Sequence, residues 1–443
     1  MENRLDRDFG FFSLLRFALP SVVMMIFTSL YSIVDGMFVS RFVGEDALAA
    51  LNIVFPAMCL TMAVGIMLAT GGSAIVARRM GAGEEQSALE GFSLLIAVSV
   101  AVGVVFALLG VTAAEPICRL LGGEGALLAY CVPYLRIIML FGPMYMLQFM
   151  FQSFFVTAGR PGLGLGLTVA AGVANMVLDY VFIVPLDLGV AGAALATVTG
   201  YCIPAVAGLV FFALRRQGLR FAKPRWDGRM LGNACFNGSS EMVSNLSSAV
   251  VTLLFNLTML ELLGPHGVSA ITIVLYAQFL LTALYIGFSI GVAPVFSFNY
   301  GADNRPRLRS LFRSCMLFVG VSAVVLLVVS LFIADAVVTV FSPRGSEVYG
   351  LAVHGFRLFA PMILFSGVNI FASALFTALS NGPVSALLSF LRTFGFLTAG
   401  LLLLPRVLGV DGVWLAVPVA ELLSFGVSLW FFRWGGKRYG YAG

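Results

Sequence analysis

Charged residues are scarce in this sequence. Asp, Glu, Lys and Arg make up 11% of its 443 residues, whereas 60% of the residues are hydrophobic and the mean hydropathy is +1.01. An ordinary soluble domain carries about 25% charged residues. The composition therefore excludes a soluble globular chain and indicates a membrane protein.

Histidine and paired cysteine are also scarce. The two histidines, His266 and His354, lie near the predicted outer ends of hydrophobic segments, and the six cysteines form no C-x-x-C pair. A metal-dependent membrane enzyme, such as a prenyl transferase, would need a His or paired Asp motifs at membrane depth. We therefore expect no enzymatic activity, no metal site beyond a possible Na⁺ site, and no cofactor.

Long hydrophobic runs make up most of the sequence. A membrane-spanning helix needs roughly 20 mostly apolar residues, and short polar clusters interrupt the hydrophobic runs about a dozen times. The runs lack the strict alternation of barrel strands. We predict an all-α membrane protein with twelve spans, at 11–42, 46–78, 86–113, 125–157, 161–185, 188–214, 229–262, 266–300, 307–334, 346–379, 383–405 and 411–433.

The basic residues favour one orientation. If both termini are cytoplasmic, the outer segments carry only Arg41, Arg119, Arg344 and Arg406. The inner segments then carry Arg4, Arg7, Arg78, Arg79, Arg215, Arg216, Arg220, Lys223, Arg225, Arg229, Arg305, Arg307, Arg309, Arg313, Lys437 and Arg438. This asymmetry follows the positive-inside rule. The net charge of +5 is therefore topological, and we expect no nucleic-acid partner.

An internal repeat divides the chain into two halves. An offset of 220 places Gly264 on Gly44, Ala270 on Ala50, Gly291 on Gly71, and "GA" at 301 on "GA" at 81. The offset returns where "LGVDGVWLA" at 408 matches "LGVAGAALA" at 188, and with one extra residue Arg357 falls on Arg136 and Asn369 on Gln148. One register held over such a length predicts two six-helix bundles.

Six spans per half make the repeats parallel, because both halves then begin on the same side of the membrane. Transporters with parallel repeats bind substrate between the halves and rock them for alternating access. We expect an N-lobe at 1–214, a C-lobe at 229–443, and a polar cytoplasmic linker at 215–228 that packs into neither lobe.

Four oxygen-bearing side chains of the first half, Asp35, Asn175, Asp179 and Thr197, share one membrane depth. At 1.5 Å per residue, each lies roughly 10 to 14 Å below the outer surface. An unpaired charge at such depth costs several kcal/mol, so this set is a candidate functional site. Because the cluster includes no Lys or Arg, its acids need a proton or a hard cation such as Na⁺. Ordinary backbone or interhelical hydrogen bonds are the alternative.

The second half carries other intramembrane charges, Glu241, Arg392 and Glu421, near the midplane. Arg392 is expected to pair with Glu421 or Glu241 as a structural ion pair, or one acid faces a central cavity and attracts a cationic substrate. Gln148 and Asn369 are polar candidates for the same cavity. Pro20 lies inside the first span, where it removes a backbone hydrogen bond and is a candidate hinge.

Several segments resemble one known family. They are "PSVVMMIFTSLYSIVDGMFVSRFVG" from 20, "RRMGAGE" from 78, "YLRI" from 134, "NMVLDYVFI" from 175 and "LGVAGAALATV" from 188. In this order, and with the repeat, they are similar to the multidrug and toxic compound extrusion (MATE) family, in particular its bacterial MepA-like type. The resemblance covers essentially the whole chain.

The resemblance implies twelve helices in two lobes, a central cleft, and export of cationic or amphipathic compounds in exchange for Na⁺ or H⁺. It also implies that Asp35, Asn175, Asp179 and Thr197 form the N-lobe cation site and that the helix bend at Pro20 responds to occupancy. Some members use further acids in the seventh and tenth spans. Here the tenth span has none between His354 and Ser380, and Glu241 comes earlier than that pattern expects.

The predicted function is therefore secondary antiport in the bacterial plasma membrane by a multi-pass monomer surrounded by lipid, with small organic cations as substrates. The nearest alternative is a lipid-linked saccharide flippase of the same superfamily. Such a flippase would need cations in the cleft, for which Arg136, Arg357 and Arg392 are the candidates. A channel is a further alternative, although it would not need two such lobes.

Overall fold

The computed structural model describes residues 4–43 and 45–441, and for residues 4, 32–41 and 45–49 it describes the backbone alone. Within this part the chain is almost entirely helical and has no β-strand. An all-helical fold satisfies backbone hydrogen bonds within each segment, as a hydrocarbon environment requires. The predicted all-α class is confirmed.

The first half begins with a short 3₁₀ turn, η1 (Arg4–Asp6), before its six spans. The helices are α1 (Phe11–Phe42), α2 (Glu45–Gly81), α3 (Glu85–Leu120), α4 (Leu128–Leu140), α5 (Gly142–Thr157), α6 (Pro161–Ile183) and α7 (Gly189–Leu214). A 3₁₀ turn, η2 (Gly125–Leu127), precedes α4, and a bend of 56° separates α4 from α5. The two helices together form one broken span, because Pro143 at the start of α5 cannot continue the α4 hydrogen-bond ladder.

The second half repeats this plan. Its helices are α8 (Gly228–Gly301), α9 (Arg305–Phe341), α10 (Glu347–Phe359), α11 (Ile363–Ala378), α12 (Gly382–Phe390), α13 (Phe396–Leu408) and α14 (Val410–Tyr439). A 3₁₀ turn, η3 (Ala360–Met362), joins α10 to α11, and a π-helical segment, η4 (Leu391–Gly395), joins α12 to α13. Gly264, with φ 65° and ψ −156°, interrupts the 74-residue α8 directly before Pro265 and divides it into two spans.

The number of spans agrees with the prediction. Ten helical segments of the described chain are long and apolar enough to cross a membrane, and the bent pair α4–α5 makes an eleventh. Because Gly264 divides α8 in two, the described residues contain twelve spans.

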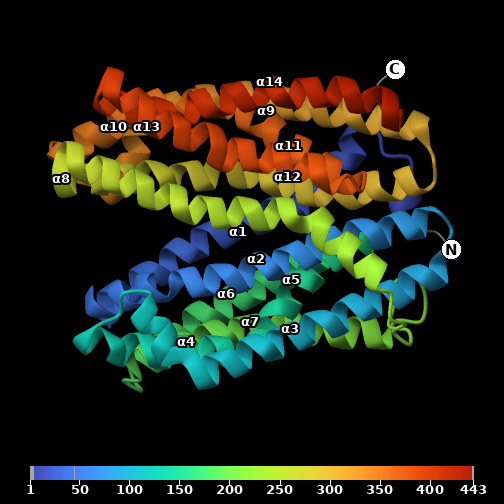
Figure 1. The fold of residues 1–443 in the computed structure, drawn as a ribbon, viewed down its shortest axis with the longest axis horizontal. Coiled ribbons are helices and arrows are strands. Elements are labelled where there is room, and N and C mark those ends of the chain that lie inside the picture. Colours follow the sequence, from blue (N-terminus) through green and yellow to red (C-terminus); the bar gives the residue numbers. More distant parts are fainter. Residues whose placement is uncertain (1–3, 44, 442–443) are drawn as a thin grey trace.

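The helices form two lobes (Figure 1). Helices α2–α7 lie in one lobe and α8–α14 in the other, with α1 running between them, and both ends of the chain lie at the same end of the molecule. The two-lobe architecture is confirmed.

The contacts between the lobes obey the repeat. Gly81, at the end of α2, packs against the backbone of Phe298 in α8, while Gly301, at the end of α8, packs against the backbone of Arg78 in α2. Because 301 and 298 are the positions that the offset of 220 assigns to 81 and 78, the two contacts are equivalent. The lobes are therefore related by a pseudo-two-fold axis.

A second pair of contacts has the same symmetry. Gly71 of α2 packs against Gly238 of α8, and Gly291 of α8 packs against Ala18 of α1. Positions 291 and 238 again differ from 71 and 18 by 220. A side chain at any of these glycines would meet backbone atoms of the other helix, so the lobes approach here as closely as helices can.

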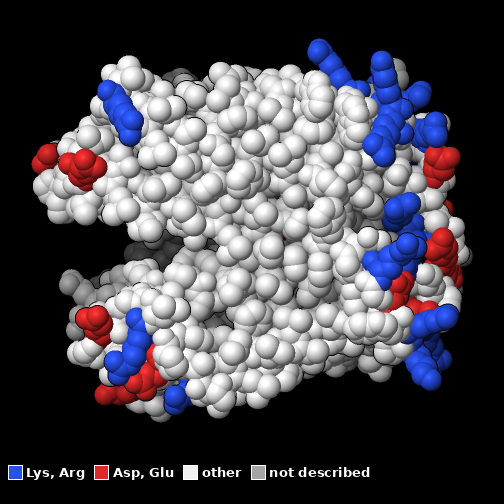
Figure 2. Space-filling view, viewed as in Figure 1, with Lys and Arg blue, Asp and Glu red and all other residues white. Residues whose placement is uncertain are grey.

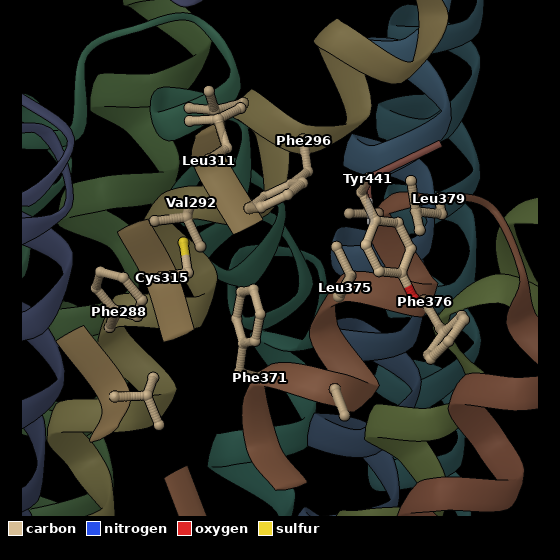
Figure 3. Packing of buried hydrophobic residues seen from close by; sticks show 14 of the residues in the cluster. Phe288, Val292, Phe296, Leu311, Cys315, Phe371, Leu375, Phe376, Leu379 and Tyr441 are labelled. Carbon is tan, nitrogen blue, oxygen red and sulfur yellow. The ribbon is translucent and has the colours of Figure 1, made fainter. Parts of the chain in front are cut away.

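Aromatic and aliphatic side chains fill the core of the second lobe. Figure 3 shows Phe288, Val292 and Phe296 of α8 facing Leu311 and Cys315 of α9 and Phe371 of α11, and each of these six side chains is at most 2% exposed. Burial of this kind contributes about 1.5–3 kcal/mol for each large side chain in water. In a membrane the stabilisation comes mainly from close packing.

The linker between the lobes differs from the prediction. Leu219 is 1% exposed within the core of the first lobe, the ring of Phe221 stacks on that of Phe92 at 5.2 Å, and the Ala222 N–H donates to Ser93 Oγ at 2.9 Å. The expectation that 215–228 packs into neither lobe was therefore wrong. Leu219 is buried in the core of the first lobe and Phe221 packs on Phe92 of α3, despite the polar composition around them.

Charge and shape distinguish the two ends of the molecule. Figure 2 shows Lys and Arg gathered at the end where both termini lie, and a cleft between the lobes at the opposite end. The glycine contacts at Gly81 and Gly301 close the lobes at the basic end, because both lie at the ends of their helices there.

Candidate functional site

The candidate cation site of the first lobe begins on α6. Asn175 and Asp179 lie one helical turn apart and are 4% and 0% exposed. Their spacing places both side chains on one face of the helix. That face is turned into the lobe rather than toward lipid.

The neighbouring helix α7 brings Thr197 to the same level. Gly200 packs against Cβ of Asn175, and Gly192 packs against Phe182, so α6 and α7 run antiparallel in a defined register. In this register Asp179 lies at the level of residues 195–196, within one helical turn of Thr197. Thr197 is half-buried, and its hydroxyl donates to the carbonyl of Ala193 at 2.9 Å, which leaves the oxygen lone pairs available as acceptors.

Helix α1 lies on the remaining side of the candidate cation site, next to α6. Gly172 of α6 packs against the rings of Phe27 and Tyr31 of α1. The first and fifth spans run in the same direction, so the backbone of residue 35, one turn beyond Tyr31, reaches the level of Asp179. The side chain of Asp35 lies outside the described part of the structure.

Asn175 is the most informative member of this group. Neither its Oδ1 nor its Nδ2 atom has a hydrogen-bond partner among the described residues, although both atoms are fully buried. Leaving a buried amide unsatisfied costs about 1–3 kcal/mol. Unsatisfied polar groups of this kind often mark a site that a ligand, an ion or water completes.

Pro20 lies where α1 meets the other lobe. Helix α1 continues through Pro20, which is half-buried. On either side of it, the α1 backbone at Ala18 and Ser21 contacts Gly291 and Gly287 of α8. A change of bend at Pro20 would therefore act on the contact between the lobes.

The second lobe contains a buried ion pair. Arg392 Nε lies 2.8 Å from Glu421 Oε1, and the side chain of Glu421 is 5% exposed. Asn369 Nδ2 donates to the other carboxylate oxygen at 2.6 Å, and the Ser428 hydroxyl donates to Asn369 Oδ1 at 2.9 Å. The network joins α11, α14 and the π-helical segment η4, a type of segment that is frequent at functional sites.

Two other candidates, Glu241 and Gln148, remain outside the network. Glu241, on α8, is half-buried and lies close enough to Arg392 to be attracted by its charge. With all three groups ionised, Glu241, Arg392 and Glu421 together carry one negative charge. Gln148, on α5 of the first lobe, is half-buried and takes no part in these contacts.

A chain of hydroxyl groups lies beside the network and was not predicted. Ser389, Ser373, Ser385, Thr377 and Ser240 are hydrogen-bonded in that order, at 2.8, 2.9, 2.7 and 3.3 Å. The chain ties α8, α11 and α12 together. Its sequence signal is the four-residue spacing of Ser373 with Thr377 and of Ser385 with Ser389, which puts each pair on one helix face.

Comparison with known families agrees with this architecture. The MatE family model matches residues 20–181 and 242–398, which is more than half of the chain. The matched region includes Pro20, Asn175 and Asp179 in the first lobe and Asn369 and Arg392 in the second.

Individual proteins align over almost the whole chain. The multidrug export protein MepA of Staphylococcus aureus strain MSSA476 is 22% identical over 93% of this chain and 91% of its own length. MepA of Staphylococcus haemolyticus strain JCSC1435 is 23% identical over 93% and 90%.

Solved structures share the fold. A crystal structure of a MATE in complex with MaL6 superposes with a TM-score of 0.93 at 20% identity, covering 99% of this chain and 98% of that one. A multidrug resistance MATE transporter of the MOP superfamily in an outward-facing conformation superposes with a TM-score of 0.91 at 21% identity, with the same coverage. The match of the family model over both halves shows that this chain belongs to the MatE family.

Proposed function

We propose that the protein is a secondary antiporter that exports cationic or amphipathic compounds in exchange for Na⁺ or H⁺. The observation that carries the proposal is the buried pair Asn175 and Asp179, which faces α7 and α1 at one membrane level. A buried carboxylate one helical turn from a carboxamide, Asn175, whose polar atoms have no partner among the described residues is suited to a small cation or a proton. The relatives named multidrug export proteins support export as the direction of transport.

Helix α1 would couple the binding of the cation or proton to the closure of the lobes. A cation or proton held between Asp179, Asn175, Thr197 and Asp35 neutralises charge where α1, α6 and α7 meet. Pro20 lies on the same helix as Asp35, where α1 contacts α8 of the other lobe. Occupancy of the site would therefore bias the bend of α1 and the closure of the lobes.

The shape of the molecule supports alternating access. The lobes touch at the basic end, and the cleft opens at the other end (Figure 2). From the positive-inside rule we infer that the basic end is cytoplasmic. Both termini would then lie in the cytoplasm, and the cleft would open toward the outside of the plasma membrane. We propose a monomer as the working unit, because each chain contains both lobes. Inward movement of one cation releases about 2.3 kcal/mol per 100 mV.

Reconstituted vesicles provide the test. Uptake or release of a cationic dye is measured with a Na⁺ gradient and a pH gradient, imposed one at a time. We expect Asp179→Asn to reduce gradient-driven transport at least tenfold. The matched control is Asp187→Asn, because Asp187 is an exposed acid just beyond α6 whose φ of 49° asparagine also adopts. Equal loss in both variants, or unchanged transport by Asp179→Asn, would contradict the proposal.

A lipid-linked saccharide flippase has less support. A pyrophosphate headgroup requires free cationic side chains in the cleft. Of the three candidate arginines, Arg392 pairs with Glu421, and Arg357 lies 2.8 Å from Asp335 in a partly exposed pair near the outer end. That leaves Arg136, which is exposed on α4, as the remaining candidate. A fluorescent lipid-flipping assay on the same vesicles distinguishes the two functions.

A further inference from the structure

A long apolar groove runs along the surface of the first lobe between α6 and α7. It has a volume of about 670 Å³. Its lining consists of Leu163, Leu167, Thr199, Cys202, Ile203, Val206, Ala207, Val210 and Phe211. The Thr199 hydroxyl donates within its own helix, to the carbonyl of Leu195 at 2.8 Å, so the groove presents an apolar surface along its length.

The groove has the dimensions of one membrane leaflet. Thr199 and Phe211 mark its two ends on α7 and lie about 18 Å apart at 1.5 Å per residue. One leaflet contributes about half of the roughly 30 Å hydrocarbon core. In the antiparallel register of α6 and α7, Leu163 lies opposite Phe211, and both are at the basic end of the molecule, where α6 begins and α7 ends.

Basic side chains lie at that end of the groove. Arg160 precedes α6, is exposed, and lies one turn from Leu163. Arg215 follows α7, and its guanidinium lies over the ring of Phe211, a lining residue, at 5.4 Å from the ring centre. A ligand that matches both the apolar groove and the basic side chains at its end has an apolar chain about one leaflet long and an anionic head at the membrane surface.

We propose that this groove binds one anionic phospholipid of the basic-side leaflet, with an acyl chain along α7 and the phosphate beside Arg160 and Arg215. The apolar surface of the groove contacts the acyl chain. The two arginines select an anionic headgroup over a zwitterionic one, because each basic group near a membrane surface contributes about fivefold to the binding of an anionic lipid. The inference does not depend on the proposed transport.

Native mass spectrometry of the full-length protein in detergent tests the proposal, with phosphatidylglycerol and phosphatidylcholine titrated separately. We expect one phosphatidylglycerol to bind more tightly than phosphatidylcholine. Arg160→Gln and Arg215→Gln should each weaken phosphatidylglycerol binding about fivefold and leave phosphatidylcholine binding unchanged. The control is Arg313→Gln, which removes an exposed basic side chain near the start of α9 in the other lobe.

The position of the acyl chain is tested by substitutions that fill the groove with a large side chain. Ala207→Trp should reduce binding of phosphatidylglycerol at least tenfold, whereas Val324→Trp, on an exposed face of α9, should not. In the wild-type protein, a phosphatidylglycerol with a photoreactive acyl chain should crosslink to peptides that contain Leu167 or Ala207. Equal binding of the two lipids by the wild type, or crosslinks confined to other helices, would overturn the proposal even if a variant fails to fold.

Discussion

Arg79 on α2 forms an ion pair with Asp227, the residue that caps α8, with 3.1 Å between Nη2 and Oδ2. Asp227 also accepts a hydrogen bond from the backbone N–H of Met230 at 2.9 Å, so one carboxylate both caps the helix and holds it to the other lobe. The contact lies at the basic end, near the close approach of Gly81 to α8.

Replacement of Asp227 separates its two roles. Asp227→Ala removes both the cap and the ion pair, and we expect it to lower the free energy of unfolding by about 1–2 kcal/mol. Asp227→Asn retains a capping oxygen and should cost less than about 1 kcal/mol, because the pair is partly exposed. Thermal unfolding of the detergent-solubilised variants measures both values. An alanine variant as stable as the asparagine variant would show that the cap contributes nothing.

The lowered pKa of Asp227 makes the stability of the folded protein depend on pH. The Met230 N–H, and next the Arg79 side chain, hold the pKa of Asp227 below its ordinary value of 3.8. A group whose pKa is lower in the folded state stabilises the fold above its unfolded pKa, and that contribution is lost as the pH falls through the folded pKa. The difference in melting temperature between wild type and Asp227→Asn should therefore be constant from pH 7 to about pH 5 and shrink below pH 4. A difference that grows on acidification would contradict this assignment.

The buried pair of the second lobe should respond differently to single and double replacement. Arg392→Gln leaves the buried carboxylate of Glu421 without its partner, and we expect it to cost about 3–5 kcal/mol. Glu421→Gln should cost less, because Arg392 is half-buried and still lies near Glu241. The double variant should be more stable than the sum of the two losses predicts, by at least about 1 kcal/mol. A double-mutant cycle on unfolding in detergent measures this coupling. Strict additivity would mean that the 2.8 Å contact carries no interaction energy.

Closure of the lobes at the basic end should depend on Gly301. Gly301→Val places a side chain against the backbone of Arg78, so the close approach of α2 and α8 is lost. Gly320→Val is the control, because a side chain at Gly320 would enter open space. We expect a cysteine probe at the basic end of α2 to be labelled several times faster in the Gly301 variant than in the wild type or the control. Similar labelling in all three would show that this contact does not close that end.

Ligand-dependent stability tests the N-lobe site without transport. If the site binds Na⁺, replacing choline by Na⁺ at about 100 times the dissociation constant should stabilise the folded protein by about 2.7 kcal/mol. Asn175→Leu and Asp179→Asn should both abolish the shift, whereas Asp187→Asn should keep it. If the coupling ion is H⁺, the shift appears on acidification instead and is again lost in Asp179→Asn. A shift that survives both replacements would place the ion elsewhere.

Much of the fold was predictable because the hydrocarbon core of a membrane permits few backbone structures. Runs of about 20 apolar residues must be helices there, and the helix ends fall within a few residues of the predicted limits for most spans. The offset of 220, visible in pairs such as Gly71 and Gly291, correctly indicated two related bundles. The break between α4 and α5 at Phe141 and the π-helical segment Leu391–Gly395 were not predicted, since a bend between two apolar helices or a local change from α to π geometry leaves the hydrophobic pattern unchanged.

The candidate sites were predictable only in part. Asn175 and Asp179 stand out because polar groups are rare in such runs, but composition does not tell which face of α6 they occupy. The hydroxyl chain through Ser373 and Ser385 was missed because serine is common on membrane helices. The prediction for the linker was wrong because its many charged residues outweigh Leu219, which is buried in the first lobe, and Phe221, which packs on Phe92 of α3.

The sequence by itself determined the membrane environment, the twelve spans, their pairing into two repeats and the level of each intramembrane polar residue, because these depend on hydrophobicity and on the fixed rise of the helix. Only the tertiary structure decided that Arg392 pairs with Glu421, that α6 and α7 leave an apolar groove, and that the lobes touch at Gly81 and Gly301. These features depend on how helices rotate about their axes and pack against one another, and a linear pattern of residues does not specify that rotation.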